Sequence, residues 1–283
     1  MYQFPIGVML DSFKLDTLEA IKKAVEIGAT GIQMYATKGQ YAPENMTPAM
    51  RRELLDMMKS HGLVFSALCG DLGMGFGNSE KNPQLIEKSK RILDLAKDLE
   101  CNIVTTHIGV VPSDNKHPRY EIMQEACGQL SRYADEMKSH FAIETGPETS
   151  MTLKGFLDSL GSRGVAVNMD PANLVMVTGD DPVQAVYNLK DYIVHTHAKD
   201  GVKLQESDPE VIYGIKDIED VIQQGEVFRE MPLGQGNVPF KKYLNALGDI
   251  GYHGFLTIER EVGSDPAADI ALAAEFLKKE MRD

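Results

Sequence analysis

Short apolar runs and amphipathic segments alternate along the whole chain. The runs are rich in Val, Ile, Leu and Phe, which is typical of buried strands, and the segments between them carry apolar residues at helical spacing. Asp16 and Thr47 are suited to cap helix starts, and Gly28 is suited to end a helix. The expected strands are residues 5–8, 31–35, 63–69, 103–109, 141–146, 165–170, 192–199 and 255–261. The expected helices are residues 16–28, 83–99, 120–137, 153–160, 182–189, 239–247 and 266–279, with a further helix beginning at Thr47.

Strand and helix patterns succeed each other in eight units, which predicts an α/β fold, a single (β/α)8 barrel of the TIM type. Residues 1–283 are expected to form one domain, because no stretch rich in Pro, Gly or Ser divides them. In such a barrel the strands end at one mouth, and functional residues gather there. The sequence therefore directs attention to the polar residues at the strand ends.

Two connections at this mouth are unusual. The glycine-rich residues 71–80 predict a flexible lid with Met74 and Phe76 at an apolar tip. A long βα loop at about 201–230 predicts a substrate lid, a partner-binding arm, or both. A contact in a homo-oligomer is one way to bury the apolar side chains of this loop, which are Val211, Ile212, Tyr213, Val221, Ile222 and Phe228.

Composition and charge narrow the class of partner. The chain has 283 residues, 43% of them hydrophobic and 25% charged, and a formal net charge of −13. That acidic balance argues against a nucleic-acid or membrane-surface binder and leaves a small-molecule substrate. No apolar run reaches the length of a membrane span, and no glycine-rich phosphate motif predicts a nucleotide cofactor. Cys69, Cys101 and Cys127 lack metal-ligand spacing and are expected to be reduced thiols of a cytoplasmic protein.

Four polar residues stand at the ends of four apolar runs: Glu144, Asp170, His197 and Glu259. The first three are evenly spaced, since 170 − 144 is 26 and 197 − 170 is 27, a step that suits one strand, one loop and one helix. A single strand-end carboxylate more often caps the next helix, but four in register indicate a shared site. Three carboxylates and one imidazole predict a divalent metal, with Mn²⁺ preferred over Co²⁺, Mg²⁺ and Zn²⁺.

Alternation along each strand points the residues two positions earlier to the same inward side. Asn168, His195 and Thr257 occupy such positions, and as buried polar groups they are expected to hydrogen-bond to the metal ligands. His107 follows the inward pattern of its own strand and is expected either to contact substrate or to be a buried core partner. Lys199 is expected to bind a substrate oxygen or anion, or to pair with a nearby carboxylate.

The motifs TTHIG, AIETG, NMDPAN, HTHAKD and IERE, in this order, carry a resemblance, together with PLGQGNVPF. The chain resembles the xylose-isomerase-like TIM-barrel superfamily of sugar isomerases and epimerases, which also contains myo-inosose dehydratase and endonuclease IV. The resemblance covers nearly the whole chain and implies metal ligands at Glu144, Asp170, His197 and Glu259. One position departs from it: epimerases similar to D-tagatose 3-epimerase carry His three residues after the metal-binding Asp, where this chain has Asn173, which can still hydrogen-bond a sugar hydroxyl.

The resemblance implies a divalent-metal-dependent sugar isomerase or keto-sugar epimerase. In that chemistry a metal holding two adjacent oxygens of a ketose acidifies the neighbouring C–H bond, and Glu144 and Glu259 act as paired acid and base through a metal-bound enediolate. The alternative is a metal-dependent keto-sugar or inosose dehydratase, which the same ligands would serve. A nuclease similar to endonuclease IV is disfavoured by the acidic balance and by the few histidines at the expected mouth.

Overall fold

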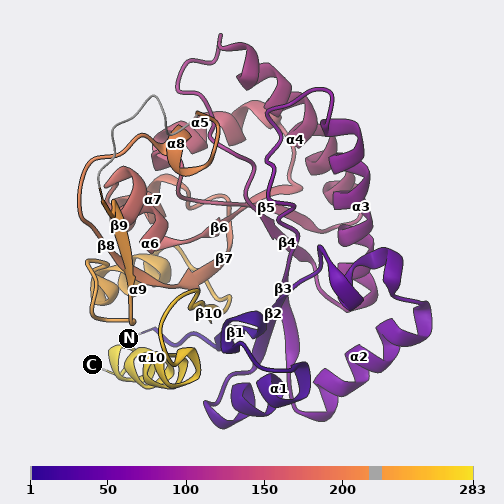
Figure 1. Cartoon of the computed structure of the whole chain (residues 1–283), viewed down its shortest axis with the longest axis vertical. Helices are drawn as coiled ribbons and strands as arrows, with labels where there is room; N and C mark the ends of the chain where they lie inside the picture. Colours follow the sequence, from indigo (N-terminus) through magenta and orange to yellow (C-terminus); the bar gives the residue numbers. More distant parts are fainter. Residues whose placement is uncertain (1, 217–224, 283) are drawn as a thin grey trace.

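The computed structural model describes residues 2–216 and 225–282, and within them eight parallel strands close into a barrel surrounded by helices (Figure 1). The order around the barrel is β1-β10-β7-β6-β5-β4-β3-β2. These strands are β1 (Ile6–Met9), β2 (Gly31–Tyr35), β3 (Val64–Cys69), β4 (Ile103–Thr106), β5 (His140–Glu144), β6 (Val165–Met169), β7 (Ile193–Ala198) and β10 (Leu256–Ile258). The predicted single (β/α)8 barrel is therefore confirmed.

Helices follow the strands in the expected alternation. They are α1 (Thr17–Glu26), α2 (Pro48–Ser60), α3 (Asn82–Asp98), α4 (Pro118–Glu136), α5 (Ser150–Leu160), α6 (Pro171–Asn173), α7 (Pro182–Asn188), α9 (Phe240–Asp249) and α10 (Pro266–Glu280). Short turns of other helical types are η1 (Leu10–Phe13), η2 (Gly39–Tyr41), η3 (Pro43–Asn45) and η4 (Leu174–Thr178). Among the described helices, none is long and apolar enough to cross a membrane.

The helix starts follow the predicted capping chemistry. Asp16 accepts the backbone N–H of Glu19, and Thr47 accepts that of Met50, so each satisfies a donor that the helix itself leaves unpaired. Gly28 has a φ of +79°, the left-handed conformation that ends α1. Several predicted strands extend too far at their carboxyl ends. The differences are largest for β4, which stops at Thr106, and β10, which stops at Ile258, so the last residues of these motifs lie at the mouth rather than in the barrel wall.

The barrel interior changes character toward the mouth. Between sheet and helices the core is apolar, with Ile21, Met58, Leu93, Leu130 and Phe156 fully buried. Nearer the mouth, the interior holds a polar layer whose members are all at most 1% exposed: Gln33, Thr105, Asn168, His195 and Thr257. Buried polar groups require hydrogen-bond partners, so this layer is expected to be bonded within itself or to the residues above it.

The described residues of the long connection after β7 form regular elements. It contains an antiparallel pair, β8 (Asp200–Lys203) with β9 (Phe228–Met231), and the short helix α8 (Pro209–Ile212), which the sequence pattern did not predict. We call residues 200–231 the arm; its described parts lie beside α6 and α7 in Figure 1. Val211, Ile212, Tyr213 and Phe228 are buried or packed against the chain's own core, so they need no second subunit, and the oligomer stays a prediction. Val221 and Ile222 lie outside the described residues.

One carboxylate fastens both ends of the arm. Asp200 is 1% exposed and accepts the backbone N–H groups of Gly201, Gly234, Gly236 and Val238 at 2.8, 3.0, 2.9 and 3.1 Å. These donors come from the first residues of the arm and from the segment that follows it. The start and the end of the arm are therefore held at a single point next to Lys199.

The glycine-rich residues 71–80 are packed against the segment that follows β4. The backbone N–H of Phe76 donates to the carbonyl of Ile108 at 2.8 Å. A Cβ on Gly75, whose φ is +58°, would come within 2.7 Å of the same carbonyl, so this approach requires glycine. Phe76 is 3% exposed whereas Met74 is 54% exposed. The prediction of Phe76 at the loop tip is wrong, because its ring fills the core against Phe141.

Candidate metal centre

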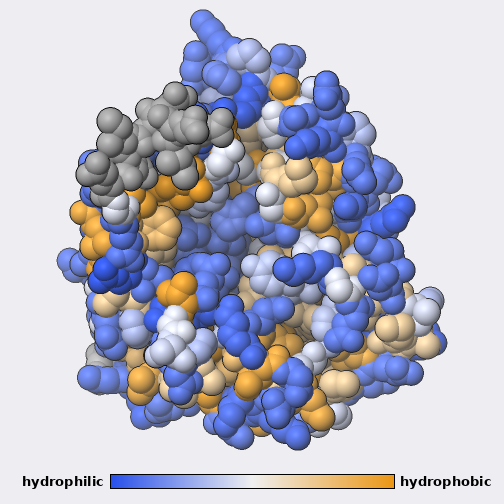
Figure 2. Space-filling model, in the orientation of Figure 1, coloured by the Kyte–Doolittle hydropathy of each residue, from blue (hydrophilic) through white to orange (hydrophobic). Residues whose placement is uncertain are grey.

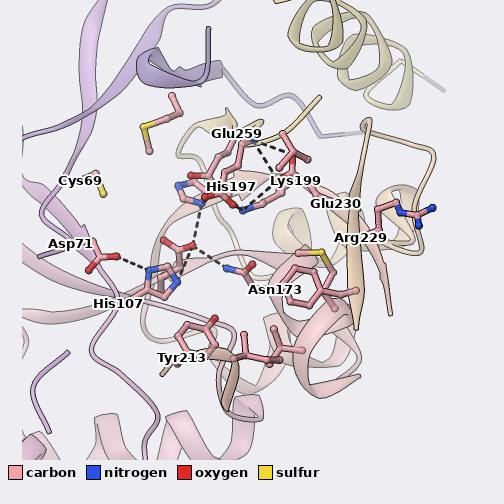
Figure 3. A pocket seen from close by; sticks show the side chains of 18 of the residues that line it. Cys69, Asp71, His107, Asn173, His197, Lys199, Tyr213, Arg229, Glu230 and Glu259 are labelled. Atoms are coloured by element: carbon pink, nitrogen blue, oxygen red, sulfur yellow. Dashed lines mark hydrogen bonds and ion pairs between the residues drawn. The ribbon is translucent and has the colours of Figure 1, made fainter. Parts of the chain in front are cut away.

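The barrel brings together the four residues predicted as metal ligands. Glu144 is the last residue of β5, Asp170 and Glu259 directly follow β6 and β10, and His197 lies near the end of β7. One ligand atom from each lies within 4.8 Å of the other three, and all four residues are buried. His197 Nδ1 is 3.3 Å from Glu259 Oε2, 3.4 Å from Asp170 Oδ2 and 3.6 Å from Glu144 Oε1. Figure 3 shows His197 beside Glu259.

Two atoms at the centre of this group have no hydrogen-bond partner. His197 Nδ1 and Asp170 Oδ2 are both buried and both unsatisfied. The other oxygen of Asp170, Oδ1, accepts the backbone N–H groups of Ala172 and Asn173, so this side chain caps α6 and still presents a free oxygen to the site. Unpartnered buried polar atoms are rare and call for a specific explanation. Three carboxylates and one imidazole nitrogen directed at one point fit a divalent cation.

The polar layer sets the orientation of the His197 ring. His197 Nε2 is 3.0 Å from Gln33 Oε1, and Gln33 Nε2 donates to Thr105 Oγ1 at 2.9 Å. Because the amide nitrogen of Gln33 faces Thr105, its oxygen accepts the hydrogen on Nε2, so Nδ1 is the ring nitrogen that faces the carboxylates. Sequence reasoning did not identify Gln33. The available signal was a polar residue at an inward position of the apolar run GIQMY.

A chain of hydrogen bonds connects His195 through Asn168 to Glu144. His195 Nδ1 donates to Asn168 Oδ1 at 2.8 Å, and His195 Nε2 accepts the hydroxyl of Thr257 at 2.9 Å. Asn168 Nδ2 then donates to Glu144 Oε2 at 3.0 Å. Burial, reinforced by the charge of His197, lowers the pKa of His195 well below its ordinary value, so the ring is neutral. Both ring nitrogens are engaged, and His195 has no free nitrogen for a metal.

Two further predicted residues lie at Oε1 of Glu144, the oxygen that Asn168 does not bind. Asn173 Nδ2 donates to Glu144 Oε1 at 3.0 Å, and His107 Nε2 lies 3.5 Å from the same oxygen. His107 Nδ1 lies 3.3 Å from Asp71 Oδ2, a residue that sequence reasoning placed only in a loop. Burial lowers the pKa of His107, but the charges of Glu144 and Asp71 outweigh it and raise the pKa to about 9. Since a quarter of its side chain is exposed, His107 belongs to the site wall and not to the closed core.

Lys199 pairs with carboxylates on the other side of the site. Its Nζ donates to Glu259 Oε2 at 3.0 Å, contacts Glu261, and lies 4.0 Å from Glu230 Oε2. Burial raises the pKa of Glu259, but the positive charges of His197 and Lys199 outweigh burial and hold it well below its ordinary value. Glu259 is therefore ionised at neutral pH. Glu230 was not predicted, because it belongs to a strand of the arm that has no strong sequence pattern.

A cavity of about 510 Å³ opens above these residues. Its lining includes Glu144, His197 and Glu259 from the barrel, together with Asn173, Lys199 and His107. Met9, Tyr35 and Cys69 also line it on the barrel side, and the sequence analysis assigned none of them to the site. Figure 2 shows a hydrophilic hollow at the centre of this face, beside more hydrophobic surface. The position at the carboxyl ends of the strands is where TIM-barrel active sites lie.

A closed (β/α)8 barrel with a carboxylate-rich candidate metal centre at its mouth defines the class of protein. The sequence profile of the family described as xylose isomerase-like TIM barrel matches residues 21–280, and the chain belongs to this family. The superfamily resemblance predicted from the motifs is thereby confirmed.

Individual relatives are distant. The uncharacterized protein MJ1311 of Methanocaldococcus jannaschii is 22% identical over 251 residues, which make up 84% of this chain and 76% of that protein. The xylose isomerase domain protein from Planctomyces limnophilus superposes with a TM-score of 0.78 at 23% identity, covering 99% of this chain and 97% of that one. A D-tagatose 3-epimerase-like protein superposes with a TM-score of 0.75 at 16% identity, covering 99% and 97%. At these identities the superpositions show a common fold.

Proposed function

We propose that the protein is a divalent-metal-dependent epimerase or isomerase of a neutral keto sugar, with Glu144 and Glu259 as the acid–base pair. The observation that carries the proposal is that both carboxylates border one cavity and approach it from different parts of the barrel. Glu144 ends β5 and Glu259 follows β10, and β6 and β7 separate these strands in the barrel order. Two carboxylates approaching a carbon from two sides can remove a proton from one face and return one to the other.

The residues that would hold the metal are Glu144, Asp170, His197 and Glu259. The donor set favours Mn²⁺, with Co²⁺, Mg²⁺ and Zn²⁺ as alternatives. When bound, the ion would polarise the sugar carbonyl and acidify the adjacent C–H bond. Burial lowers the pKa of His197, but Glu259 and Glu144 outweigh burial and hold this pKa well above its ordinary value. Loading the metal must therefore displace a proton from His197, as is general for imidazole ligands.

The surroundings of the two carboxylates differ in a way that suits two roles. Glu259 is held ionised by Lys199 and His197, which suits acceptance of a proton. Glu144 accepts a hydrogen bond from the side-chain amide of Asn173 and lies beside His107. The pKa of His107 is about 9, so this imidazole is protonated at neutral pH. A protonated imidazole at 3.5 Å from Glu144 can supply the proton that Glu144 returns to the substrate. On this basis we propose Glu259 as the base and Glu144 as the acid in one direction of the reaction.

The charges of the cavity favour an unphosphorylated sugar. Six acidic side chains line the cavity, and its described lysine and arginine, Lys199 and Arg229, are both paired with carboxylates. A phosphate group would meet this negative field without an uncommitted lysine or arginine among the described lining residues. His107, Asn173 and Lys199 line the cavity with N–H groups, and we assign them the contacts to sugar hydroxyls.

Hydrogen exchange into ketoses tests the proposal directly. Mn²⁺-loaded protein is incubated with a panel of ketoses in D₂O, and deuterium at carbon is followed by NMR and mass spectrometry. Wild type should place deuterium on a carbon next to the carbonyl, and Glu144→Gln and Glu259→Gln should each abolish this exchange. Glu275→Gln, an exposed change on α10 outside the cavity lining, is the matched control. Circular dichroism shows whether each variant is folded.

The product distinguishes the candidate reactions. Inversion at the exchanged carbon identifies an epimerase, and transfer of the carbonyl to the next carbon identifies an isomerase. Loss of one water from the substrate would identify the dehydratase instead. A folded protein that binds metal and exchanges no ketose proton contradicts the proposal. The nuclease alternative has little support. Among the described residues, one group of His, Asp and Glu side chains could hold a metal ion, whereas an endonuclease IV-like site would need several such groups.

A further inference from the structure

One aromatic residue of the arm reaches the cavity above the candidate metal centre. Tyr213 directly follows α8 and belongs to the lining of this cavity. The residues assigned above to sugar hydroxyls, His107, Asn173 and Lys199, all follow strands of the barrel. Tyr213 therefore comes to the cavity from a different part of the chain, and the proposed chemistry gives it no role.

The hydroxyl of Tyr213 lies beside the residues that contact Glu144. A Cβ on Gly146 would lie 3.0 Å from Tyr213 Oη and 2.8 Å from Asn173 Cβ, so the bare main chain at Gly146 leaves room for both side chains. The rings of Tyr213 and His107 are 5.9 Å apart, centre to centre. In Figure 3 the hydroxyl oxygen of Tyr213 is directed toward the part of the site that holds His107 and Asn173. Tyr213 thus brings a hydroxyl to the Glu144 side of the cavity.

This hydroxyl is available to a ligand. Among residues 2–216 and 225–282, none forms a hydrogen bond with Tyr213 Oη. Burial, reinforced by the charges of Glu144 and Glu148, raises the pKa of Tyr213, so the phenol keeps its hydrogen at neutral pH. A neutral phenol donates one hydrogen bond and also accepts. A sugar hydroxyl in the cavity would supply the partner that the described protein residues do not.

An ion pair holds the turn that carries Tyr213. Glu210 on α8 pairs with Arg119 on α4, and the two side chains are only 21% and 17% exposed, so water screens the pair weakly. Lys216 also pairs with Glu210, at 2.6 Å, but it is 50% exposed. The backbone N–H of Ile215 donates to the carbonyl of Glu210 at 2.7 Å, which closes the turn around Tyr213. Arg119 therefore holds the segment from which Tyr213 extends.

Arg119 is itself confined by its surroundings. It lies in the first turn of α4, one of the helices that surround the barrel. Its aliphatic part packs on Gly77, where a Cβ would lie 3.0 Å from Arg119 Cδ. The side chain is thus held between the glycine-rich residues 71–80 and the arm. Asp200 fastens the two ends of the arm, and Arg119 fastens its middle.

We infer that Tyr213 is a substrate-binding residue and that the Arg119–Glu210 ion pair positions it over the site. That the ligand is a sugar rests on the proposed function, whereas the place of Tyr213 in the cavity does not. The Tyr213 hydroxyl binds a sugar hydroxyl on the Glu144 side, and Lys199 lies across the cavity from it (Figure 3). Selectivity between sugars is thereby set partly by the arm and not by the barrel alone.

Fluorine NMR measures the position of Tyr213 without any turnover. The protein is labelled with 3-fluorotyrosine and loaded with Mg²⁺, and Tyr213→Phe identifies the Tyr213 signal among those of ten tyrosines. Arg119→Met should move this signal in the absence of sugar, whereas Arg119→Lys keeps the charge and should leave it near the wild-type position. Lys154→Met, which breaks an ion pair on α5 outside the cavity, is the matched control. An unmoved signal in Arg119→Met would overturn the positioning role.

The ketose panel of the exchange experiment tests the contact. Ketoses that bind should shift the Tyr213 fluorine signal. Loss of one neutral hydrogen bond in Tyr213→Phe should raise the KM for deuterium exchange about 2- to 10-fold with kcat near wild type. Arg119→Met should raise KM to a similar extent, and adding Tyr213→Phe to it should raise KM no further. Tyr187→Phe, which removes an exposed hydroxyl on α7 outside the cavity, should leave KM unchanged.

The outcomes separate this inference from the proposed reaction. Wild-type KM in Tyr213→Phe, or an equal rise from Tyr213→Phe in the wild-type and Arg119→Met backgrounds, would overturn it. A fluorine signal that no ketose shifts would overturn it as well. For a sugar that binds without exchange, Kd from the fluorine titration replaces KM. A sugar that shifts the signal and binds more weakly to Tyr213→Phe, yet exchanges no proton, would reject the reaction and support the contact.

Discussion

Replacing Gln33 with methionine should weaken metal binding although no ligand is changed. Gln33 is fully buried, accepts from His197 Nε2 at 3.0 Å and donates to Thr105 Oγ1 at 2.9 Å. Methionine preserves the approximate volume and removes both bonds. Without this acceptor, the His197 tautomer with its hydrogen on Nε2 is no longer favoured. The other tautomer carries its hydrogen on Nδ1, where it blocks the position of the metal.

The magnitude follows from these contacts. Loss of a hydrogen-bond partner to a metal-binding imidazole costs about 10- to 100-fold in metal affinity, which is about 1.4–2.7 kcal/mol. In the metal-free protein the unsatisfied buried N–H should lower the free energy of unfolding by about 1–3 kcal/mol. Thr105 keeps a donor bond to the carbonyl of Leu68 at 3.5 Å, so its hydroxyl adds little to that loss.

Titration of Mn²⁺ into chelator-treated protein by calorimetry measures the first effect, and urea denaturation of the metal-free protein measures the second. Gln184→Met, on the exposed side of α7, is the matched control and should change neither quantity beyond error. Wild-type Mn²⁺ affinity in Gln33→Met would refute the argument that the amide fixes the ring. An equal fall in both variants would refute it as well.

Two pH-dependent predictions concern buried charges. Lys199→Met removes a positive charge that holds the pKa of Glu259 down, so the pH below which deuterium exchange is lost should move upward, whereas Lys199→Arg should keep it near the wild-type position. If the exchange rate of Lys199→Met falls at the same acidic pH as that of wild type, the prediction is contradicted. Burial raises the pKa of Glu148 to about 8, so the folded protein binds more protons there than the unfolded chain, and stability is lost as pH rises from about 4.3 toward 8. Glu148→Gln keeps an acceptor for the N–H of Val111 and should raise Tm at pH 8, with a gain that shrinks toward pH 5; a gain equal at both pH values in calorimetric scans would contradict it.

The strand-end residues could be predicted because the barrel repeats. Each strand–helix unit returns the chain to the same mouth, so Glu144, Asp170 and His197 share a depth once their strands are identified. Alternation within a strand then places Asn168 and His195 inward, where hydrogen bonds to one another and to Glu144 are observed. Both inferences depend on local periodicity alone, which a single sequence contains.

Contacts between distant segments could not be predicted in this way. Gln33 meets His197 across the barrel, 164 residues away in sequence, and only the closed strand order brings them together. Glu230 reaches Lys199 through β9, a strand of four residues whose sequence FREM has no alternating pattern. Tyr213 lines the site because the arm folds back over the mouth, which depends on packing rather than on local propensity.

Asp200 has a consequence for how this barrel can diversify. Because its carboxylate binds main-chain N–H groups at both ends of the arm, the two ends stay joined whatever lies between them. The entropy of closing a loop rises only slowly with its length, so the interior of the arm can be lengthened, shortened or exchanged at small cost to the barrel. Such exchanges would replace Tyr213 and Ile215 and leave the strand-end carboxylates in place. Evolution or protein engineering can thus exchange the interior of the arm while the barrel and its candidate metal centre stay unchanged.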